Sequence, residues 1–236
     1  MTATEQIIPV TGEDSGIIIK NFPRPSAEVI DRLSKLPIAN ISDAMNKHGV
    51  MHYEIRPIFP GTHFCGPALT CGSLDLTVKI FALSLIKPGD VFIQASGGIH
   101  EYACFGELGS NGVKSRGGVG AIVDGAVRDV LGIKEVGLPV FARSVTPRNY
   151  HYPFGQPFGS VNRPVIVAGV LVNPGDVIVA SDEGVVVVPL SMAEKVATAA
   201  EKIQAEEEQR RAGIRSGKIP YDKIEEQLRA AGYSIR

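Results

Sequence analysis

The residues of this chain that could do chemistry together lie within the glycine-rich stretch 97–129. Gly106, Glu107, Leu108 and Gly109 stand there at the expected start of a helix. The first turn of a helix has free backbone N–H groups and the positive end of the helix dipole, so it favours an anionic ligand. The sequence therefore predicts a binding site for a negatively charged molecule at this turn.

Arg128 and Asp129 follow a short apolar strand that is expected over residues 121–123. Ligands of α/β proteins usually bind where strands end. An arginine beside an aspartate combines a bidentate carboxylate-binding group with a hard oxygen ligand for Mg²⁺. A structural ion pair that closes a loop is the alternative interpretation of these two residues taken alone.

The spacing of the two groups is more specific than either group. Glu107 is followed by twenty residues and then by Arg128 and Asp129, which resembles the acidic-x20-Arg-Asp signature of the RraA-like family. This family includes divalent-metal aldolases that cleave 4-hydroxy-4-methyl-2-oxoglutarate and 4-carboxy-4-hydroxy-2-oxoadipate, and also the regulator of ribonuclease E activity. The resemblance extends over about residues 26–189, with further matching segments at residues 40–44, 87–90, 125–129, 137–141, 174–176 and 182–189.

The resemblance implies a role for each residue of the signature. Asp129 would coordinate the divalent cofactor, Mg²⁺ or Mn²⁺, and Arg128 would bind the carboxylate and carbonyl of a pyruvyl group. Backbone amides of Gly106, Leu108 and Gly109, together with that of the intervening glutamate, would bind the substrate carboxylate. All of these residues lie within one chain.

Two glutamates complete the implied site. Glu107 would hold metal-bound water, although the aldolases commonly have aspartate at this position. The aldolases also take a glutamate from the C-terminal helix of a neighbouring subunit, and Glu207 is the best candidate here, with Glu206 close behind. A solvated helix face is the alternative interpretation of the acidic run 206–208.

The implied function is a class II pyruvate aldolase that cleaves a 4-hydroxy-2-oxo dicarboxylic or tricarboxylic acid to pyruvate and an oxo acid. Breaking the C3–C4 bond leaves the pyruvate enolate, whose charge the metal and Arg128 would stabilise. The same enolate forms when oxaloacetate loses CO₂, so oxaloacetate decarboxylation is an expected side activity. No lysine, Lys79 and Lys114 included, shows a sequence context that indicates a lowered pKa, so a Schiff-base aldolase is disfavoured.

Two other functions stay open. One is a non-catalytic trimeric regulator of the ribonuclease E type, but such regulators are shorter and lack the helical tail of residues 191–236. The other is a different metal-dependent lyase or decarboxylase on the same scaffold, with another acceptor pocket. Loop residues that could face the acceptor are Arg143, Arg148, Tyr150 and His151.

The elements that must position these residues alternate early in the chain and are mostly strands later. Helices are expected over residues 26–36, with Ser26 as the N-cap, and over residues 42–49, 76–85, 107–115, 191–211 and 221–231. Strands are expected over residues 66–72, 91–95, 121–123, 140–142, 165–172, 177–180 and 185–188. Asn40, Asp43 and Asp75 also recur in the family and are interpreted as structural.

This pattern predicts an α/β domain with some antiparallel pairing. The expected organisation is an N-terminal arm over residues 1–25, the α/β domain over residues 26–190, and a C-terminal helical extension over residues 191–236. The resemblance implies the swivelling β/β/α fold, assembled as a homotrimer or homohexamer with sites between subunits.

Composition gives no sign of a nucleic-acid or membrane partner, and the resemblance implies a small 2-oxo acid and further copies of the chain as partners. Lys and Arg total 24 and Asp and Glu total 25, so a net charge of −1 gives no general attraction to nucleic acid or anionic lipid. No G-x-S-x-G, P-loop or HExxH motif occurs, the five histidines are scattered, and the three cysteines lack CxxC spacing. With no basic leader and no apolar run of about 18 residues, a cytoplasmic protein is expected.

Overall fold

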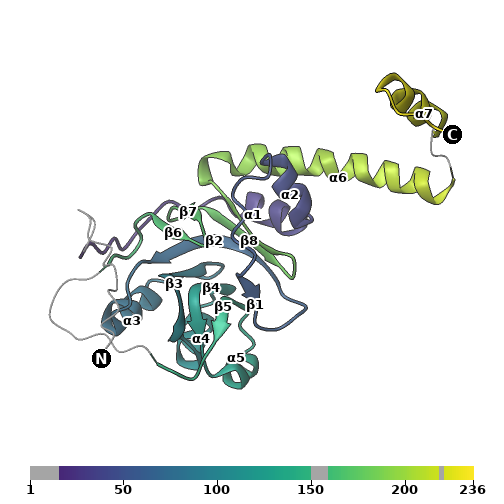
Figure 1. The fold of residues 1–236 in the computed structure, drawn as a ribbon. Coiled ribbons are helices and arrows are strands. Elements are labelled where there is room, and N and C mark those ends of the chain that lie inside the picture. Colours follow the sequence, from purple (N-terminus) through teal and green to yellow (C-terminus); the bar gives the residue numbers. More distant parts are fainter. Residues whose placement is uncertain (1–15, 150–158, 218–220) are drawn as a thin grey trace.

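The computed structural model describes residues 16–149, 159–217 and 221–236, which form a mixed α/β fold as predicted (Figure 1). Its strands are β1 (Arg56–Pro57), β2 (His63–Cys71), β3 (Val91–Phe105), β4 (Gly120–Val127), β5 (Val140–Val145), β6 (Val165–Val167), β7 (Val170–Val172), β8 (Val177–Ser181) and β9 (Gly184–Val188). Its helices are α1 (Ala27–Ser34), α2 (Ile38–Ala44), α3 (Leu76–Ser84), α4 (Glu107–Lys114), α5 (Val130–Val136), the 3-10 turn η1 (Leu190–Met192), α6 (Ala193–Arg215) and α7 (Tyr221–Ala230).

The main sheet has the strand order β1-β5-β4-β3-β2-β8-β9 within the described residues, and β6 pairs with β7 in a separate hairpin. The central strands β2, β3, β4 and β5 are parallel neighbours, whereas β1, β8 and β9 are antiparallel additions. Parallel strands bring their carboxyl ends to one edge of the sheet. Helices α3, α4 and α5 begin at this edge, each directly after its strand.

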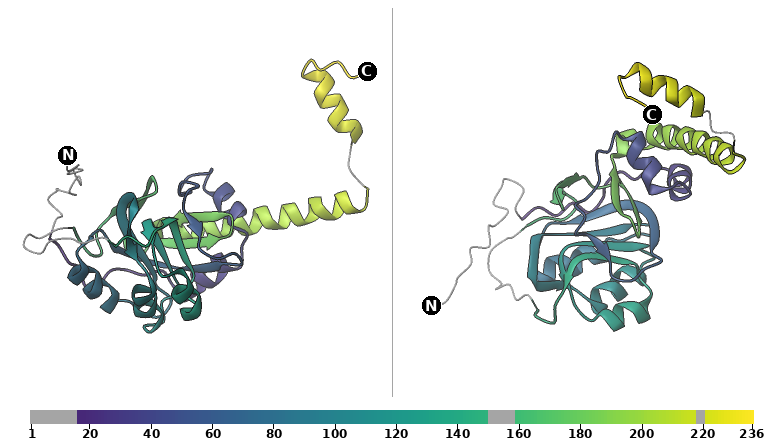
Figure 2. Two further views of the ribbon diagram at one scale, coloured as in Figure 1. Left: turned by 60° about the horizontal axis from the view of Figure 1, so that its bottom comes forward. Right: turned by 45° about the vertical axis from the view of Figure 1, so that its right-hand side comes forward.

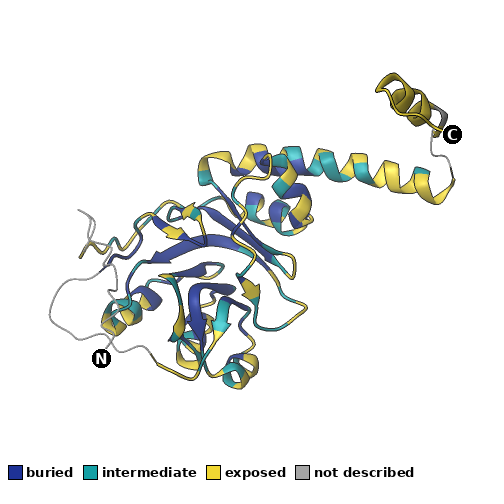
Figure 3. Ribbon diagram, in the orientation of Figure 1, coloured by how far each residue is buried: buried dark blue, intermediate teal, exposed yellow. Residues whose placement is uncertain are grey.

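Both faces of the sheet centre are covered, as the dark ribbon in Figure 3 shows. Phe92 and Val123 face the core beneath α3, α4 and α5, whereas Ile122 and Phe141 face the core shared with β6, β7, β8 and β9. Every residue of β4 is buried. Strands that are covered on both faces have continuous apolar runs, which is why the sequence of β4 shows little alternation.

Helices α1, α2 and α6 form a separate layer that packs on β8 and β9. Leu33, Ile41, Val196 and Ala200 are buried together there with valines of the two strands. Beyond this layer α6 extends away from the body of the molecule (Figure 2), and its residues after about 201 are mostly exposed. No helix in the described part of the chain has both the length and the apolar character needed to cross a membrane.

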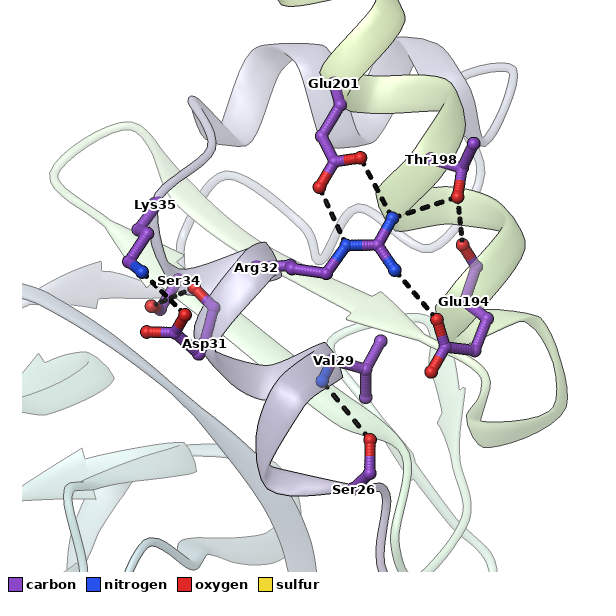
Figure 4. Close-up of polar contacts among 9 residues, drawn as sticks. All are labelled: Ser26, Val29, Asp31, Arg32, Ser34, Lys35, Glu194, Thr198 and Glu201. Atoms are coloured by element: carbon purple, nitrogen blue, oxygen red, sulfur yellow. Dashed lines mark hydrogen bonds and ion pairs between the residues drawn. The ribbon is translucent and has the colours of Figure 1, made fainter.

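Arg32 ties α1 to α6 (Figure 4). Its guanidinium donates to both carboxylate oxygens of Glu201 at 2.8 and 2.9 Å, to Glu194 at 2.9 Å and to the Thr198 hydroxyl at 2.9 Å. The hydrogen bonds from Arg32 hold the pKa of the Glu201 carboxyl below its usual range. This bidentate pair fixes the direction in which the long helix leaves the domain.

Most of the predicted elements are confirmed in type and place. Ser26 caps α1 by accepting the Val29 N–H at 3.3 Å, and Asp75 caps α3 by accepting the N–H groups of Thr77 and Val78 at 2.7 and 3.1 Å. The structural role expected of Asp75 is therefore confirmed. The elements β2, α3, α4, β8, β9, α6 and α7 lie within a few residues of their predicted positions.

The second helix lies elsewhere than predicted. The sequence predicts residues 42–49, whereas α2 begins at Ile38 and ends at Ala44. Ile38 and Ile41 are buried in the helical layer, and this burial outweighs the capping preference of Ser42. Asn46 and Lys47 have positive φ angles of 52° and 66°, so the helix ends before them.

Three strand predictions are also corrected. β3 runs on to Phe105, and β4 runs through Asp124 and Gly125, because irregular pairing continues between these two strands beyond the predicted ends. The apolar run 165–172 is a hairpin, since Ala168 and Gly169 have φ angles of 49° and 82° and reverse the chain between β6 and β7. Helix α5 has no counterpart in the prediction, because its seven residues are too few to show a helical period.

We predict that Arg32→Met lowers the melting temperature at neutral pH more than Lys35→Met, whose lysine pairs with Asp31 on α1 itself. Because the folded pKa of Glu201 is lowered, its stabilisation is present above the usual glutamate pKa and is lost as the pH falls through the lowered value. The difference in melting temperature between wild type and Arg32→Met should therefore shrink in acid. Thermal melts from pH 3 to pH 7 test this, and equal effects of the two variants would contradict it.

Candidate functional site

Gly106, Arg128 and Asp129 lie together at the carboxyl edge of the parallel strands. The Arg128 backbone N–H donates to the Phe105 carbonyl at 3.0 Å, which joins the turn after β4 to the turn after β3. A Cβ atom added at Gly106 would lie 2.7 Å from Asp129 Oδ2 and 3.2 Å from Arg128 Cγ. A side chain at position 106 would require the Asp129 carboxylate to move. The turn at Gly106 and the residues Arg128 and Asp129 are therefore packed directly against each other.

Asp129 starts α5 in a strained backbone conformation. Its φ and ψ angles are 55° and 44°, in the left-handed region that residues with a Cβ rarely occupy. Its side chain caps no N–H of α5, and it is 43% exposed. Arg128 Nε lies 3.4 Å from Asp129 Oδ2, so the carboxylate stays close to one positive charge while its oxygens face solvent.

Glu107 begins α4 and leans toward the neighbouring helix. A Cβ atom added at Gly132, in the first turn of α5, would lie 2.6 Å from Glu107 Oε2. Both acidic groups of the signature, Glu107 and Asp129, are therefore placed at helix starts, where backbone N–H groups favour negative charge.

Leu108 points outward and is 82% exposed, whereas Gly109 lies against the Phe105 ring. For these two residues the backbone, not a side chain, is what the α4 turn offers a ligand.

The site fits a hard divalent cation better than zinc. No group of three or more His, Cys, Asp or Glu side chains in the described ranges is arranged to hold a metal, so these ranges supply no zinc cage. Mg²⁺ is commonly bound through one or two carboxylates, with waters and substrate oxygens as the other ligands. The exposed Asp129 carboxylate suits such a cation.

Glu207 is not brought to this site within one chain. It lies on α6, where the Asn40 side-chain amide of α2 donates to its carboxylate at 3.3 Å. The helical layer that contains both residues covers β8 and β9, whereas α4 and α5 lie at the opposite end of the molecule (Figure 1). The assignment of Glu207 to a site stays a prediction that requires a second subunit.

The acceptor-pocket candidates lie in different places. Arg143 forms ion pairs with Asp124 and Glu54, and it shares a sheet face with Phe141, opposite the face covered by α3, α4 and α5. The Arg148 guanidinium lies 5.5 Å from the centre of the Tyr102 ring. The structure therefore ties Arg143 to a structural cluster, while Tyr150 and His151 lie outside the described residues.

Lys79 has an environment that its sequence context does not reveal. Its ammonium group donates to the Cys104 carbonyl at 2.7 Å, and burial lowers its pKa, with the nearby charge of Arg128 acting in the same direction. The sequence gives no sign of this lowered pKa. The sequence shows only a single lysine in the apolar helix LTVKIFALS, and its burial depends on strands that are distant along the chain.

Residues 38–187 match the family model RraA-like, which is described as Aldolase/RraA. The chain belongs to the RraA-like family. The matched residues include Gly106, Arg128 and Asp129, so the site described above lies within the region that defines the family. The resemblance seen in the acidic-x20-Arg-Asp spacing is thus confirmed.

The similar proteins include some that are named as aldolases and others that are named as ribonuclease inhibitors. A Halalkalibacterium halodurans protein, provisionally named 4-hydroxy-4-methyl-2-oxoglutarate aldolase, is 31% identical over 189 residues, which are 79% of this chain and 89% of that protein. Streptomyces coelicolor RraAS2, described as an unusual member of the RNase ES inhibitor RraA family, has a TM-score of 0.71 and 29% identity over 81% of this chain and 99% of its own. The RNA-processing inhibitor RraA from Thermus shares the fold, with a TM-score of 0.58 and 24% identity over 66% of this chain and 93% of its own.

We predict that Asp129→Gly raises the free energy of unfolding by about 1 kcal/mol, because glycine adopts the left-handed conformation without the strain of a Cβ. Asp129→Ala removes the same carboxylate but keeps the strain, so it serves as the matched control and should not be stabilised. Urea denaturation of both variants measures the difference. Equal destabilisation of the two would contradict the prediction, since the carboxylate would then be supporting the fold.

Proposed function

We propose that this member of the RraA-like family is a class II pyruvate aldolase that cleaves a 4-hydroxy-2-oxo dicarboxylic or tricarboxylic acid. One observation carries the proposal: Arg128 and the exposed Asp129 carboxylate stand side by side against Gly106, at the carboxyl edge of the sheet. This arrangement offers a carboxylate-binding group, a hard cation ligand and free helix N–H groups within one small area.

Each group has a task in the cleavage. A divalent cation held by Asp129 would supply a Lewis acid for the 2-oxo group of the substrate. Arg128 binds the carboxylate of the pyruvyl part with paired hydrogen bonds and stabilises the charge that develops as the C3–C4 bond breaks. The first-turn N–H groups of α4 orient the same carboxylate, and Glu107 accepts, through an intervening water, the proton of the C4 hydroxyl.

Glu207 from a neighbouring subunit would complete the proton path, which requires a homotrimer or homohexamer. The reach of α6 beyond the domain supports this part of the proposal, because the helix has length to contact a second copy. Its exposed second half carries the acidic run that includes Glu206 and Glu207. Within its own chain, Asn40 already holds Glu207 against α2.

A regulator of ribonuclease activity is the second candidate. The observation that favours it is the similarity to RraAS2, whose whole length this chain covers almost completely. Such a protein would act through its surface and would release no pyruvate. Co-purification with ribonuclease E, set against metal-dependent pyruvate release, separates the two functions.

We predict that the purified protein releases pyruvate from 4-hydroxy-4-methyl-2-oxoglutarate with Mg²⁺, and more slowly from oxaloacetate, in an assay coupled to lactate dehydrogenase. EDTA should abolish both reactions, and Asp129→Ala should lower both rates by at least about 100-fold because the cation ligand is lost. Wild-type rates in the Asp129→Ala variant would refute the site. If the wild type releases no pyruvate from either substrate and binds no metal, the regulator function is favoured.

We also predict that Gly106→Ala weakens Mn²⁺ binding by about tenfold, because the added Cβ would displace the Asp129 carboxylate, which lies 2.7 Å away. Gly112→Ala is the matched control on the same helix, since its Cβ would meet only the flexible Leu83 side chain. Electron paramagnetic resonance of free Mn²⁺ measures both affinities. Unchanged binding in the Gly106 variant would place the cation elsewhere.

A further inference from the structure

Lys79 reaches the same edge of the sheet as the signature residues, although it comes from α3. Its ammonium group is half-buried and donates to the carbonyl of Cys104, close to the end of β3 and two residues before Gly106. Cys71, the last residue of β2, and Arg128, directly after β4, both act on its charge. The amine therefore lies where the carboxyl ends of three parallel strands meet.

No carboxylate among the described residues forms an ion pair with Lys79. Within the described ranges, the groups that act on its charge are Cys71, Cys104 and Arg128, none of which is a carboxylate. Burial raises the pKa of the Cys71 thiol to about 11 and also raises that of Cys104, so both thiols are neutral at physiological pH. A half-buried ammonium near a guanidinium, without an acidic partner, favours either the loss of its proton or the binding of an anion.

We propose that Lys79 supplies a further positive charge, beside Arg128 and the cation that Asp129 would hold, for an enolate dianion bound at this site. Pyruvate carries one negative charge on its carboxylate, and the enolate formed by C3–C4 cleavage carries a second one on its oxygen. Arg128 neutralises the first charge, and the ammonium of Lys79 would add through space to the stabilisation of the second charge that the cation at Asp129 would supply. Lys79 thus selects the doubly charged form over the singly charged one, which favours the cleavage step rather than substrate binding.

This inference rests on the site of the proposed function, but its test does not require turnover. Oxalate is a dianion that mimics the enolate, and pyruvate is the matching monoanion. Isothermal titration of each ligand in the presence of Mg²⁺ at pH 7.5 gives a ratio of affinities. A merely structural role for Lys79 would change both affinities alike and leave this ratio unaltered.

We predict that Lys79→Met weakens oxalate binding by about tenfold, the size expected for one partly screened charge interaction, while pyruvate binding changes by less than about threefold. Lys79→Arg, which keeps the charge, should restore the oxalate affinity. Lys114→Met is the matched control, because this exposed lysine also donates to a backbone carbonyl, that of Gly137 at 3.3 Å, but lies in the last turn of α4. Circular dichroism melts verify that each variant is folded.

The pH dependence gives a second readout. Since the pKa of Lys79 is lowered, the amine loses its proton, and with it the attraction for oxalate, at a pH below that of an ordinary lysine. Oxalate affinity of the wild type should therefore fall as the pH rises from 7.5 to 9.5, whereas Lys79→Arg should show no such fall.

The outcomes separate this inference from the proposed function. Equal loss of oxalate and pyruvate binding in Lys79→Met, or no loss of either, would overturn the role of Lys79 and leave the aldolase proposal standing. Failure of the wild type to bind oxalate would also overturn the role of Lys79. If no hydroxy acid releases pyruvate but Lys79→Met selectively loses oxalate binding, the aldolase proposal is refuted. The role of Lys79 in binding a dianion is then retained.

Discussion

The close approach of Gly106 to Asp129 is the contact on which the candidate site depends. It exists because β3 and β4 are parallel neighbours whose following turns meet at one edge, and because the Arg128 N–H bonds the Phe105 carbonyl across them. A residue with a Cβ at position 106 would push the carboxylate away. The sheet therefore fixes the distance between the two turns, and glycine at position 106 allows the Asp129 carboxylate to lie against the turn that begins α4.

The local parts of this arrangement could be predicted from the sequence, because caps, turns and spacing are local properties. Asp75 before an apolar run predicts the start of α3, and the spacing from Glu107 to Arg128 and Asp129 predicts the family. Elements whose type depends on tertiary packing could be predicted less well from the sequence. The start of α2, the split at Ala168 and Gly169, and the short helix α5 are set by burial and backbone conformation rather than by pattern.

The charges around the site depend even more on distant contacts. Arg143 looks like a candidate for substrate binding until the sheet register places it on the other face with Asp124 and Glu54. Lys79 looks like an ordinary helix lysine until α3 covers the ends of β2 and β3 and buries its amine near Arg128. The left-handed backbone conformation of Asp129 could likewise not be predicted, since aspartate occurs in many backbone conformations and its sequence neighbours do not indicate this one. Lys79, Arg128 and the exposed Asp129 carboxylate thus place charges of both signs at this edge of the sheet.

The central claim is that a divalent cation binds at Asp129 beside Arg128. Its most direct test is an anomalous difference map from crystals of the protein grown with Mn²⁺ and pyruvate. We predict a peak at coordinating distance from the Asp129 carboxylate, with the pyruvate carboxylate in contact with Arg128. A fully occupied Mn²⁺ peak elsewhere, with none at Asp129, would contradict it.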